Sequence, residues 1–402
     1  MKKILTLFVI FCFGLNSKSY ANNEKLSINA KNALLYDVTY EEMLYEKNIK
    51  EKIPNASTTK ILTAIVAYEN CSMEDNVEIS ENPPRISGSK LGLKKGDIVK
   101  MEDLMKGLLI SSGNDAAIAI AEHVGGNVEK FCEMMNEKAK SLGAENTNFI
   151  TPHGLDEDNH YSTAEDLLIF SKSFMKNSYL KEIANMEKTT IKIGNYEKEI
   201  YATNEMLFVY DSVNGIKTGY TSKAGRCLIT SMVSGDRNLI AVVLGCDSKN
   251  HRTEDTKSLL LYGFEDFEEV DVCQKMKNKY EIRVQKAKTP KIELFIKGEK
   301  KVLLKKVLKN DLKYEYKIPV NLTAPINSGE VVGEINVCLK DEFLLEIPVK
   351  MPCDIQVKSV LEYFLDIFID QNYHIEVKVW IIKMPKNKQK MVLDRKLCYN
   401  NK

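Results

Sequence analysis

Three short strings of polar residues, in a fixed order, constrain this chain more than any other feature of its sequence. They are Ser57-Thr58-Thr59-Lys60, Ser112-Gly113-Asn114 and Lys217-Thr218-Gly219, with 55 residues from Ser57 to Ser112 and 105 from Ser112 to Lys217. Together they supply a nucleophile, two amines and a hydroxyl relay, the parts of a serine acyl-transfer site that needs no histidine. They can form one site only in a fold that brings the three segments together.

The first string lies where a serine can be activated. Residues 54–56 predict a turn and residues 61–67 predict a buried helix, so Ser57 falls at or near the helix N-terminus. Residues three apart share a helix face, which puts the Lys60 amine beside the Ser57 hydroxyl. Lysine can take the serine proton only if burial or a second cation lowers its pKa, and Lys217 is the expected second cation. The unpaired N–H groups at the helix start favour the negative charge of a tetrahedral intermediate.

The other two strings lie in fitting contexts. Ser112-Gly113-Asn114 stands between the apolar runs 108–110 and 116–121, as a loop between helices does. Lys217-Thr218-Gly219 precedes residues 226–230 and 238–244, which predict strands. A phosphate-binding loop is excluded because the glycines it needs before Lys217 are missing. Each string alone is also compatible with an ordinary turn or helix start, but chance does not easily supply all three in order.

The text around the strings points to a known family. The segments that carry the resemblance are 44–48, 107–117, 148–155, 160–167 and 214–221. They resemble the low-molecular-mass penicillin-binding proteins that act as D-alanyl-D-alanine carboxypeptidases, which belong to the penicillin-recognising serine enzymes. The likeness spans residues 25 to about 265 and, more weakly, about the next ninety.

The resemblance implies catalytic roles for three residues. Ser57 is expected to be acylated by the penultimate D-alanine carbonyl, with Lys60 as the base. Ser112 is expected to relay a proton to the departing D-alanine. The implied oxyanion hole consists of the backbone N–H groups of Ser57 and Tyr220.

The resemblance also implies substrate-binding residues. Asn114 is expected to hold the substrate amide, and the string Lys217-Thr218-Gly219 to bind the terminal carboxylate. Tyr220 stands where many relatives carry histidine, which leaves the backbone donor intact and the preference for substrate side chains open. Arg252 either contributes positive charge to carboxylate binding or is a solvated arginine at a helix start.

Shifts in pattern predict an α+β chain in several parts. Residues 1–21 have a basic start, a short apolar core and Ala21 at a cleavage position, which predicts a signal peptide. Residues 22–268 are expected to form a catalytic domain, with an antiparallel sheet flanked by helices and a helical lobe over about 101–185, of the β-lactamase/transpeptidase-like type that the resemblance implies. Short alternating runs predict a small all-β sandwich over 269–354, followed by a tail over 355–402.

The tail has two segments of different character. Its first part predicts a helix with one apolar face, formed by Val357, Val360, Leu361, Phe364, Leu365 and Phe368. Residues 371–402 carry eight basic and two acidic side chains, a net charge of +6, around Trp380. Peripheral contact with an anionic membrane is one interpretation, and packing on the β-domain is the other.

Composition and cysteine usage agree with an exported cell-wall enzyme. Removal of the signal peptide changes the formal charge from +1 to −2, and nothing indicates nucleic-acid binding. Of nine cysteines, eight follow the signal peptide without any Cys-x-x-Cys spacing, which favours buried free thiols over a disulfide scaffold. His153, Asp156, Asp158 and His160 cluster, but we interpret them as a structured loop and expect neither a metal nor a cofactor.

Three function classes remain open at this point. A D-Ala-D-Ala carboxypeptidase would trim wall pentapeptides on the outer face of the cytoplasmic membrane or in the wall, and β-lactam antibiotics would acylate it. A β-lactamase-like hydrolase or a DD-endopeptidase would use the same chemistry, but no Glu-x-x-x-Asn loop follows the second string and Ser112 is followed by glycine rather than aspartate. A non-catalytic wall-binding protein is the third class.

Overall fold

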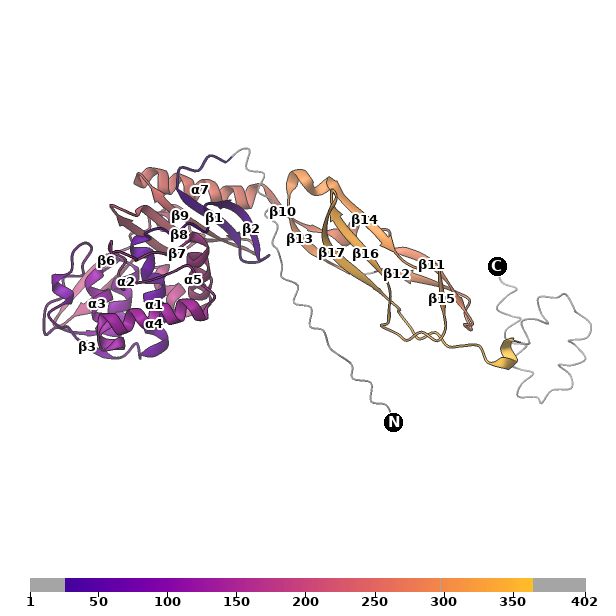
Figure 1. Cartoon of the computed structure of the whole chain (residues 1–402), viewed down its shortest axis with the longest axis horizontal. Coiled ribbons are helices and arrows are strands. Elements are labelled where there is room, and N and C mark those ends of the chain that lie inside the picture. Colours follow the sequence, from indigo (N-terminus) through magenta and orange to yellow (C-terminus); the bar gives the residue numbers. More distant parts are fainter. Residues whose placement is uncertain (1–25, 297, 364–402) are drawn as a thin grey trace, which may run out of the picture. The chain divides into compact units, whose positions relative to one another are not determined.

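The computed structural model of the chain describes residues 26–296 and 298–363 (Figure 1). These residues divide into two compact units. Unit 1 contains the chain up to Glu268 together with Leu303–Lys306, and unit 2 contains the remainder. The mixture of helices and antiparallel sheets confirms the expected α+β class. The predicted signal peptide at 1–21 lies outside the described residues.

Unit 1 is built around one five-stranded antiparallel sheet. Its order is β2-β1-β9-β8-β7, and the strands are β1 Asn32–Asp37, β2 Glu42–Lys47, β7 Val213–Thr221, β8 Gly225–Ser234 and β9 Arg237–Cys246. Strand β9 is apolar and buried over most of its length, and β8 is buried at residues 227–231, as strands covered on both faces are. Strand β7, which carries the third string, is at one edge.

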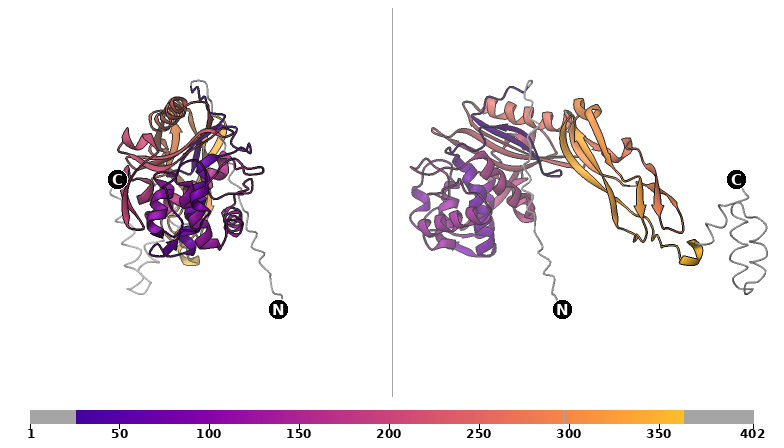
Figure 2. Two further views of the ribbon diagram at one scale, coloured as in Figure 1. Left: turned by 90° about the vertical axis from the view of Figure 1, so that its left-hand side faces the viewer. Right: turned by 45° about the vertical axis from the view of Figure 1, so that its right-hand side comes forward.

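Helices cover both faces of this sheet (Figure 2). Helix α7 packs on β1, β8 and β9, whereas α5 packs on β1 and β9 and α1 reaches β7. The helices of unit 1 are α1 Lys60–Asn70, α2 Met101–Leu109, α3 Asn114–Gly125, α4 Val128–Ser141, α5 Ala164–Lys176, α6 Ser178–Ala184 and α7 Lys249–Glu265. Helices α2 to α6 correspond to the helical lobe predicted over 101–185.

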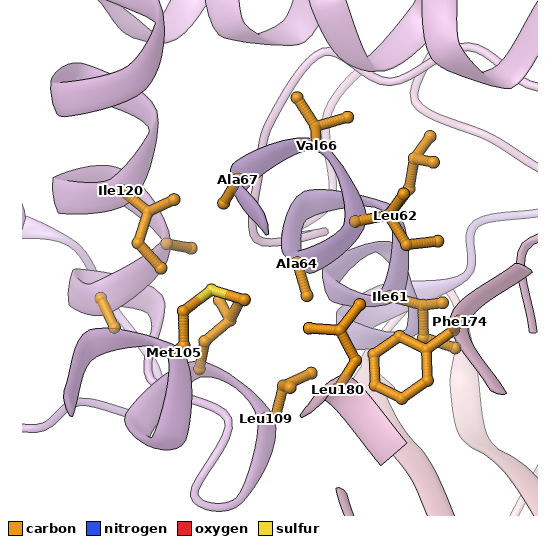
Figure 3. Close-up of a cluster of buried hydrophobic side chains, with 14 of the residues drawn as sticks. Ile61, Leu62, Ala64, Val66, Ala67, Met105, Leu109, Ile120, Phe174 and Leu180 are labelled. Atoms are coloured by element: carbon orange, nitrogen blue, oxygen red, sulfur yellow. The ribbon is translucent and has the colours of Figure 1, made fainter. Parts of the chain in front are cut away.

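Helix α1 lies at the centre of the helical lobe. Residues 60–67 are all buried, and the helix contacts α2, α3, α4 and α5. Figure 3 shows Ile61, Leu62 and Ala64 surrounded by side chains from those neighbours, among them Met105, Ile120 and Phe174. A helix that is apolar on all sides is stable only inside a core. This core fixes α1, and α1 fixes the position of the first string.

Short elements complete unit 1. The two-stranded antiparallel pairs are β3 Asn76–Glu78 with β4 Ile98–Lys100, and β5 Lys188–Ile193 with β6 Tyr196–Tyr201. The 3₁₀ turns are η1 Ala56–Thr59, η2 Pro83–Arg85 and η3 Glu205–Phe208. Two of these turns, η1 and η3, pack against β7.

Unit 2 contains the predicted small β-sandwich. One sheet has the order β12-β11-β15 and the other β14-β16-β17, and residues of both, such as Ile282, Leu294, Ile335 and Val349, share one core. The division between the units falls within β10 and β13, which pair with each other. The elements are β10 Phe267–Asp271, η4 Val272–Lys275, β11 Lys279–Gln285, β12 Lys291–Phe295, β13 Lys301–Lys305, η5 Lys306–Asp311, β14 Leu312–Lys317, β15 Asn321–Thr323, β16 Val331–Leu339 and β17 Glu342–Lys350.

The start of the tail continues unit 2. Ile355 forms a β-bridge with Ile326, and Val357 forms one with Ala287. Val360 and Leu361, which the sequence places on an apolar face, are exposed. The remaining residues of that face and the +6 segment lie outside the described residues. Nowhere in residues 26–296 and 298–363 is a helix both long and apolar enough to cross a membrane.

The cysteines of the described chain are all free thiols. Cys132, Cys227, Cys246 and Cys338 are buried, Cys71 and Cys273 are half-buried, and Cys353 is exposed. Burial raises the pKa of the Cys227 thiol to about 11, which makes it a poor nucleophile. Cys398 lies outside the described residues.

Candidate active site

Ser57, the candidate nucleophile, lies on a turn that local polar contacts fix. Asn55 Nδ2 donates hydrogen bonds to Thr58 Oγ1 and Thr59 Oγ1 at 3.1 and 3.0 Å, and Thr58 Oγ1 donates to the Asn55 carbonyl at 2.6 Å. Thr58 and Thr59 are buried, whereas Ser57, which precedes them, is partly exposed. The polar side chains of Asn55, Thr58 and Thr59 therefore bond to one another, and the Ser57 hydroxyl is left for other contacts.

Lys60 is in direct contact with this hydroxyl. Its Nζ lies 2.8 Å from Ser57 Oγ, 2.7 Å from Asn114 Oδ1 and 2.9 Å from the His153 carbonyl oxygen. An amide oxygen and a carbonyl oxygen only accept hydrogen bonds, whereas a hydroxyl can also donate. A neutral amine therefore satisfies all three partners, because it donates to the two oxygens and its lone pair accepts the Ser57 proton.

The surroundings of Lys60 favour this neutral form. Burial lowers the pKa of Lys60 well below its ordinary value, and the positive charge of Lys217 lowers it further. The carboxylate of Asp115 acts in the opposite direction. The neutral amine that a base requires thus lies in contact with the Ser57 hydroxyl, and the two causes of the lowered pKa are the burial and the second cation expected from the sequence.

The second string connects α2 to α3. Ser112 is buried with φ of 62°, a backbone region that non-glycine residues rarely adopt. Its hydroxyl has no hydrogen-bond partner among the described residues. Asn114 begins α3, where its Nδ2 donates to the Ser87 carbonyl at 2.7 Å. Because that bond fixes the amide, Oδ1 is turned toward Lys60.

Asp115 organises the segment beside Asn114, and the sequence reasoning missed it. Its buried carboxylate accepts hydrogen bonds from the backbone N–H groups of Leu91, Gly92 and Leu93 at 2.8, 2.8 and 3.2 Å. The carboxylate thereby binds residues 91–93 to the start of α3. An acidic residue in the first turn of the predicted helix was the available signal.

The third string brings β7 against turn η1, which contains Ser57. A Cβ atom added to Gly219 would lie 3.0 Å from the Ser57 backbone nitrogen and 3.0 Å from Ala56 Cβ. The absence of a side chain at Gly219 therefore allows the strand to approach η1 closely. Thr218 Oγ1 lies 2.6 Å from Thr203 Oγ1, and Lys217 Nζ donates to the Thr218 carbonyl at 3.1 Å.

Lys217 is a buried amine whose pKa lies near neutral pH. Burial, together with the positive charge of Arg252, lowers the pKa of Lys217 to about 7. Near neutral pH, Lys217 therefore still carries its proton in a substantial fraction of molecules.

Tyr220 and Arg252 lie at different depths around β7. The Tyr220 ring is exposed, and the Arg226 guanidinium of strand β8 stacks on it at 3.7 Å from the ring centroid. Arg252 lies in the first turn of α7 but is buried, and it forms an ion pair with Glu205. The interpretation of Arg252 as a solvated arginine at a helix start is therefore wrong, because the side chain is buried.

The loop between α4 and α5 contains the cluster of His153, Asp156, Asp158 and His160. Nδ1 of His153 accepts from the Leu155 N–H and Nδ1 of His160 from the Ile150 N–H, both at 3.1 Å. Asp156 accepts from Thr221 Oγ1 at 2.6 Å, and Asp158 pairs with Lys223 at 3.7 Å.

Burial keeps both histidines neutral. It is the first cause that lowers the pKa of His153 to about 3 and that of His160 to about 4. This loop touches the two sides of the site, because the His153 carbonyl accepts from Lys60 and Asp156 binds the end of β7. Gly154 lies against η1, since a Cβ atom there would be 1.9 Å from the Ala56 carbonyl oxygen.

The structure thus brings most of the predicted residues to one place. Ser57, Lys60 and Asn114 are in direct contact, Gly219 packs on the Ser57 backbone, and Lys217 acts on Lys60 by its charge. Arg252 acts on Lys217 by charge. The residues that the sequence reasoning did not identify are Asp115, the His153 carbonyl and Glu205.

Comparison with protein families gives two matches. Residues 18–248 match the family described as D-alanyl-D-alanine carboxypeptidase, and residues 267–356 match the C-terminal domain of penicillin-binding protein 5. D-alanyl-D-alanine carboxypeptidase DacF of Bacillus subtilis (strain 168) is 34% identical over 347 residues, which cover 84% of this chain and 89% of DacF. DacD of Escherichia coli (strain K12) is 32% identical over 369 residues, which cover 86% of this chain and 93% of DacD.

Solved structures of related proteins also superpose on this chain. D-alanyl-D-alanine carboxypeptidase DacD from Francisella tularensis superposes with a TM-score of 0.67 at 28% identity, over 83% of this chain and 95% of that one. Penicillin-binding protein D2 from Listeria monocytogenes, solved in an ampicillin-bound form, gives 0.55 at 29% identity, over 60% of this chain and 99% of that one.

Proposed function

This chain belongs to the D-alanyl-D-alanine carboxypeptidase family, a family of serine hydrolases, and we propose that it removes the terminal D-alanine of peptidoglycan pentapeptides through an acyl-enzyme on Ser57. The observation that carries the assignment of residues is the contact of the buried Lys60 amine with Ser57 Oγ at 2.8 Å. A hydroxyl is a weak nucleophile until a neighbouring base removes its proton.

Acylation begins when Ser57 Oγ attacks the carbonyl carbon of the penultimate D-alanine. The hydroxyl proton passes to Lys60 Nζ, and the oxyanion of the tetrahedral intermediate accepts hydrogen bonds from the backbone N–H groups of Ser57 and Tyr220. The C–N bond then breaks, and Ser112 relays a proton to the departing D-alanine amine. Water hydrolyses the ester, which releases the shortened peptide and regenerates Ser57.

Substrate binding uses the groups around the nucleophile. Lys217 and Thr218 bind the terminal carboxylate, and Gly219 lets β7 lie beside Ser57. Asn114 holds the substrate amide as well as Lys60, because its side chain is already oriented by Ser87. Tyr220 contributes its backbone N–H, while its exposed ring borders the site.

Release of D-alanine from diacetyl-Lys-D-Ala-D-Ala tests this function. We expect turnover, and we expect hydrolysis of penicillin to be slow because no Glu-x-x-x-Asn segment lies between the second and third strings to position a deacylating water. Rapid penicillin hydrolysis without D-alanine release would indicate a β-lactamase. Cleavage of cross-linked dimers alone would indicate an endopeptidase, and penicillin binding without any turnover a non-catalytic wall protein.

The partners and location follow from the same proposal. A relative of this chain has been solved in an ampicillin-bound form, and we propose that β-lactams acylate Ser57 here as well. The signal peptide at 1–21 supports export, with a catalytic domain over 22–268 and a β-sandwich over 269–354 outside the cytoplasmic membrane. The enzyme then lies in the wall or on the outer face of that membrane.

The tail is proposed to bind the membrane surface, and truncation tests this role. The mature chain cut after Tyr363 retains the bridges of Ile355 and Val357 to unit 2, so we expect it to keep full activity on a soluble peptide. It is expected to lose binding to vesicles of anionic lipid, because the +6 segment is gone. Flotation of both chains with such vesicles is the measurement.

High salt and a charge variant serve as controls for the tail. Salt is expected to weaken the binding of the full-length chain without eliminating it, since only the electrostatic part is screened. Replacement of Lys386, Lys388 and Lys390 by glutamine should reduce binding while the apolar residues remain. Failure of the full-length chain to float at low salt would reassign the tail to packing on the β-domain.

A further inference from the structure

A buried ion pair lies next to the third string and involves a residue that no sequence motif identified. Arg252 is 4% exposed, and its Nη2 donates to both carboxylate oxygens of Glu205, one of them at 2.6 Å. Thr253 Oγ1 donates to the same carboxylate. Glu205 is the first residue of turn η3, so the pair joins η3 to the start of α7.

Glu205 is held in a fixed place relative to strand β7. Just before it, Thr203 Oγ1 lies 2.6 Å from Thr218 Oγ1, and Asn204 Nδ2 donates to the Gly215 carbonyl at 3.0 Å. Asn204 Oδ1 also accepts from the Met206 N–H at 3.1 Å, which caps η3. These bonds therefore fix the segment that contains Glu205 to β7, the strand that contains Lys217 and Thr218.

Glu205 is also the main anchor of the Arg252 side chain. Nε of Arg252 is buried and has no hydrogen-bond partner among the described residues. Thr253 shares the carboxylate but does not contact the guanidinium in any bond of the described chain. Loss of the Glu205 carboxylate would thus leave a buried cation both uncompensated and free to move.

The charges around Lys217 come from four elements. Arg252 on α7 is a cation, Glu205 on η3 is an anion paired with it, Lys60 on α1 is an amine whose neutral form is favoured, and Asp115 on α3 acts on Lys60. Burial strengthens each of these interactions, because the protein interior screens charge far less than water does. Without Glu205, the buried Arg252 would have no carboxylate partner among the described residues, and its uncompensated charge would act on Lys217.

We propose that Glu205 is a positioning residue of the carboxylate subsite: it holds Arg252 out of contact with the substrate and compensates its charge, so that Lys217 retains the proton that binds the terminal carboxylate. Arg252 then acts on Lys217 through its field and does not itself bind the substrate. This inference rests on the proposed function, in which Lys217 binds that carboxylate.

The pH dependence of Glu205→Gln tests the inference. Because burial and Arg252 already lower the pKa of Lys217 to about 7, removal of the compensating carboxylate lowers it further. The alkaline limb of kcat/KM for diacetyl-Lys-D-Ala-D-Ala is expected to move to lower pH by about half a unit to one unit. The profile for the analogue with an amidated C-terminus should stay in place, since it has no carboxylate for Lys217.

Two variants make the result specific. Glu205→Gln combined with Arg252→Gln removes both charges, so the alkaline limb should return to the wild-type position or beyond it. Thr253→Val removes a hydrogen bond to Glu205 but keeps its charge, so the profile should not move. Thermal unfolding shows whether Glu205→Gln folds. If it does not, the pH profiles of the double variant and of Glu205→Asp, which retains the charge, are compared with that of the wild type.

The outcomes separate this inference from the proposed function. An unchanged alkaline limb in folded Glu205→Gln, or an equal shift with both substrates, overturns the role of Glu205 while D-alanine release by the wild type stands. A wild type that releases no D-alanine contradicts the proposed function. In that case the pH dependence of acylation by labelled penicillin, which also carries a carboxylate, still tests Glu205.

Discussion

Replacement of Ser57 by alanine is expected to abolish both covalent labelling by penicillin and release of D-alanine. Lys60 Nζ reaches Ser57 Oγ at 2.8 Å, and no other serine of the described chain donates to or accepts from this amine. Loss of an enzyme's nucleophile lowers kcat by a factor of about 10³ or more, which in practice leaves no turnover. Mass spectrometry of the labelled wild type should locate the adduct on Ser57.

Ser111→Ala is the matched control for the nucleophile. Ser111 is next to Ser112 in the chain, but its hydroxyl is used by the Gly107 carbonyl at 3.0 Å. This variant should label and turn over like the wild type. An adduct on Ser112, or labelling that survives in Ser57→Ala, would show that the nucleophile has been assigned to the wrong residue.

Replacement of Lys60 and of Lys217 by methionine is expected to impair different steps of the reaction. Lys60→Met removes the base, so acylation should fall by a factor of about 10² to 10⁴ even at saturating substrate. Lys217→Met removes the cation that binds the carboxylate, so kcat/KM should fall by about tenfold to a hundredfold. That second loss should be much smaller with the amidated analogue.

Single-turnover acylation and steady-state kinetics on both substrates measure this difference. Lys223→Met serves as a control, because this exposed lysine lies on the turn after β7 and pairs only with Asp158 among the described residues. Since Lys60→Met leaves Asn114 Oδ1 and the His153 carbonyl without their donor, its thermal stability should be recorded alongside. Equal losses of Lys217→Met on the two substrates would remove Lys217 from the carboxylate role.

The local part of the site was predictable from the sequence, and its distant partners were not. Ser57 and Lys60 are three residues apart, and helical geometry alone brings them together. The third acceptor of Lys60 is the carbonyl of His153, 93 residues away, and a backbone carbonyl has no signature in a sequence. Glu205 and Arg252, 47 residues apart, likewise meet only through the packing of η3 and α7 around β7.

The same distinction applies to the fold. Apolar runs and period-two alternation predicted the helical lobe and the β-sandwich, because these patterns record which face of an element is buried. The order of the large sheet was not predictable in this way. Strand β1 pairs with β9, some two hundred residues later, as in Leu34 opposite Val242, and both strands are apolar enough to occupy several positions in a sheet.

Strand β7 is the last strand of its sheet, and it therefore leaves one line of backbone N–H and C=O groups without a neighbouring strand among the described residues. Proteins commonly protect such an edge with lysine, proline or a bulge, because an open edge is a template for aggregation. Here the register shift between Val213 and Ile216 interrupts the start of β7, and turns η1 and η3 pack against the strand. Protection of the edge is thus shared between these elements, and the stretch beside Ser57 is where an extended peptide is expected to lie.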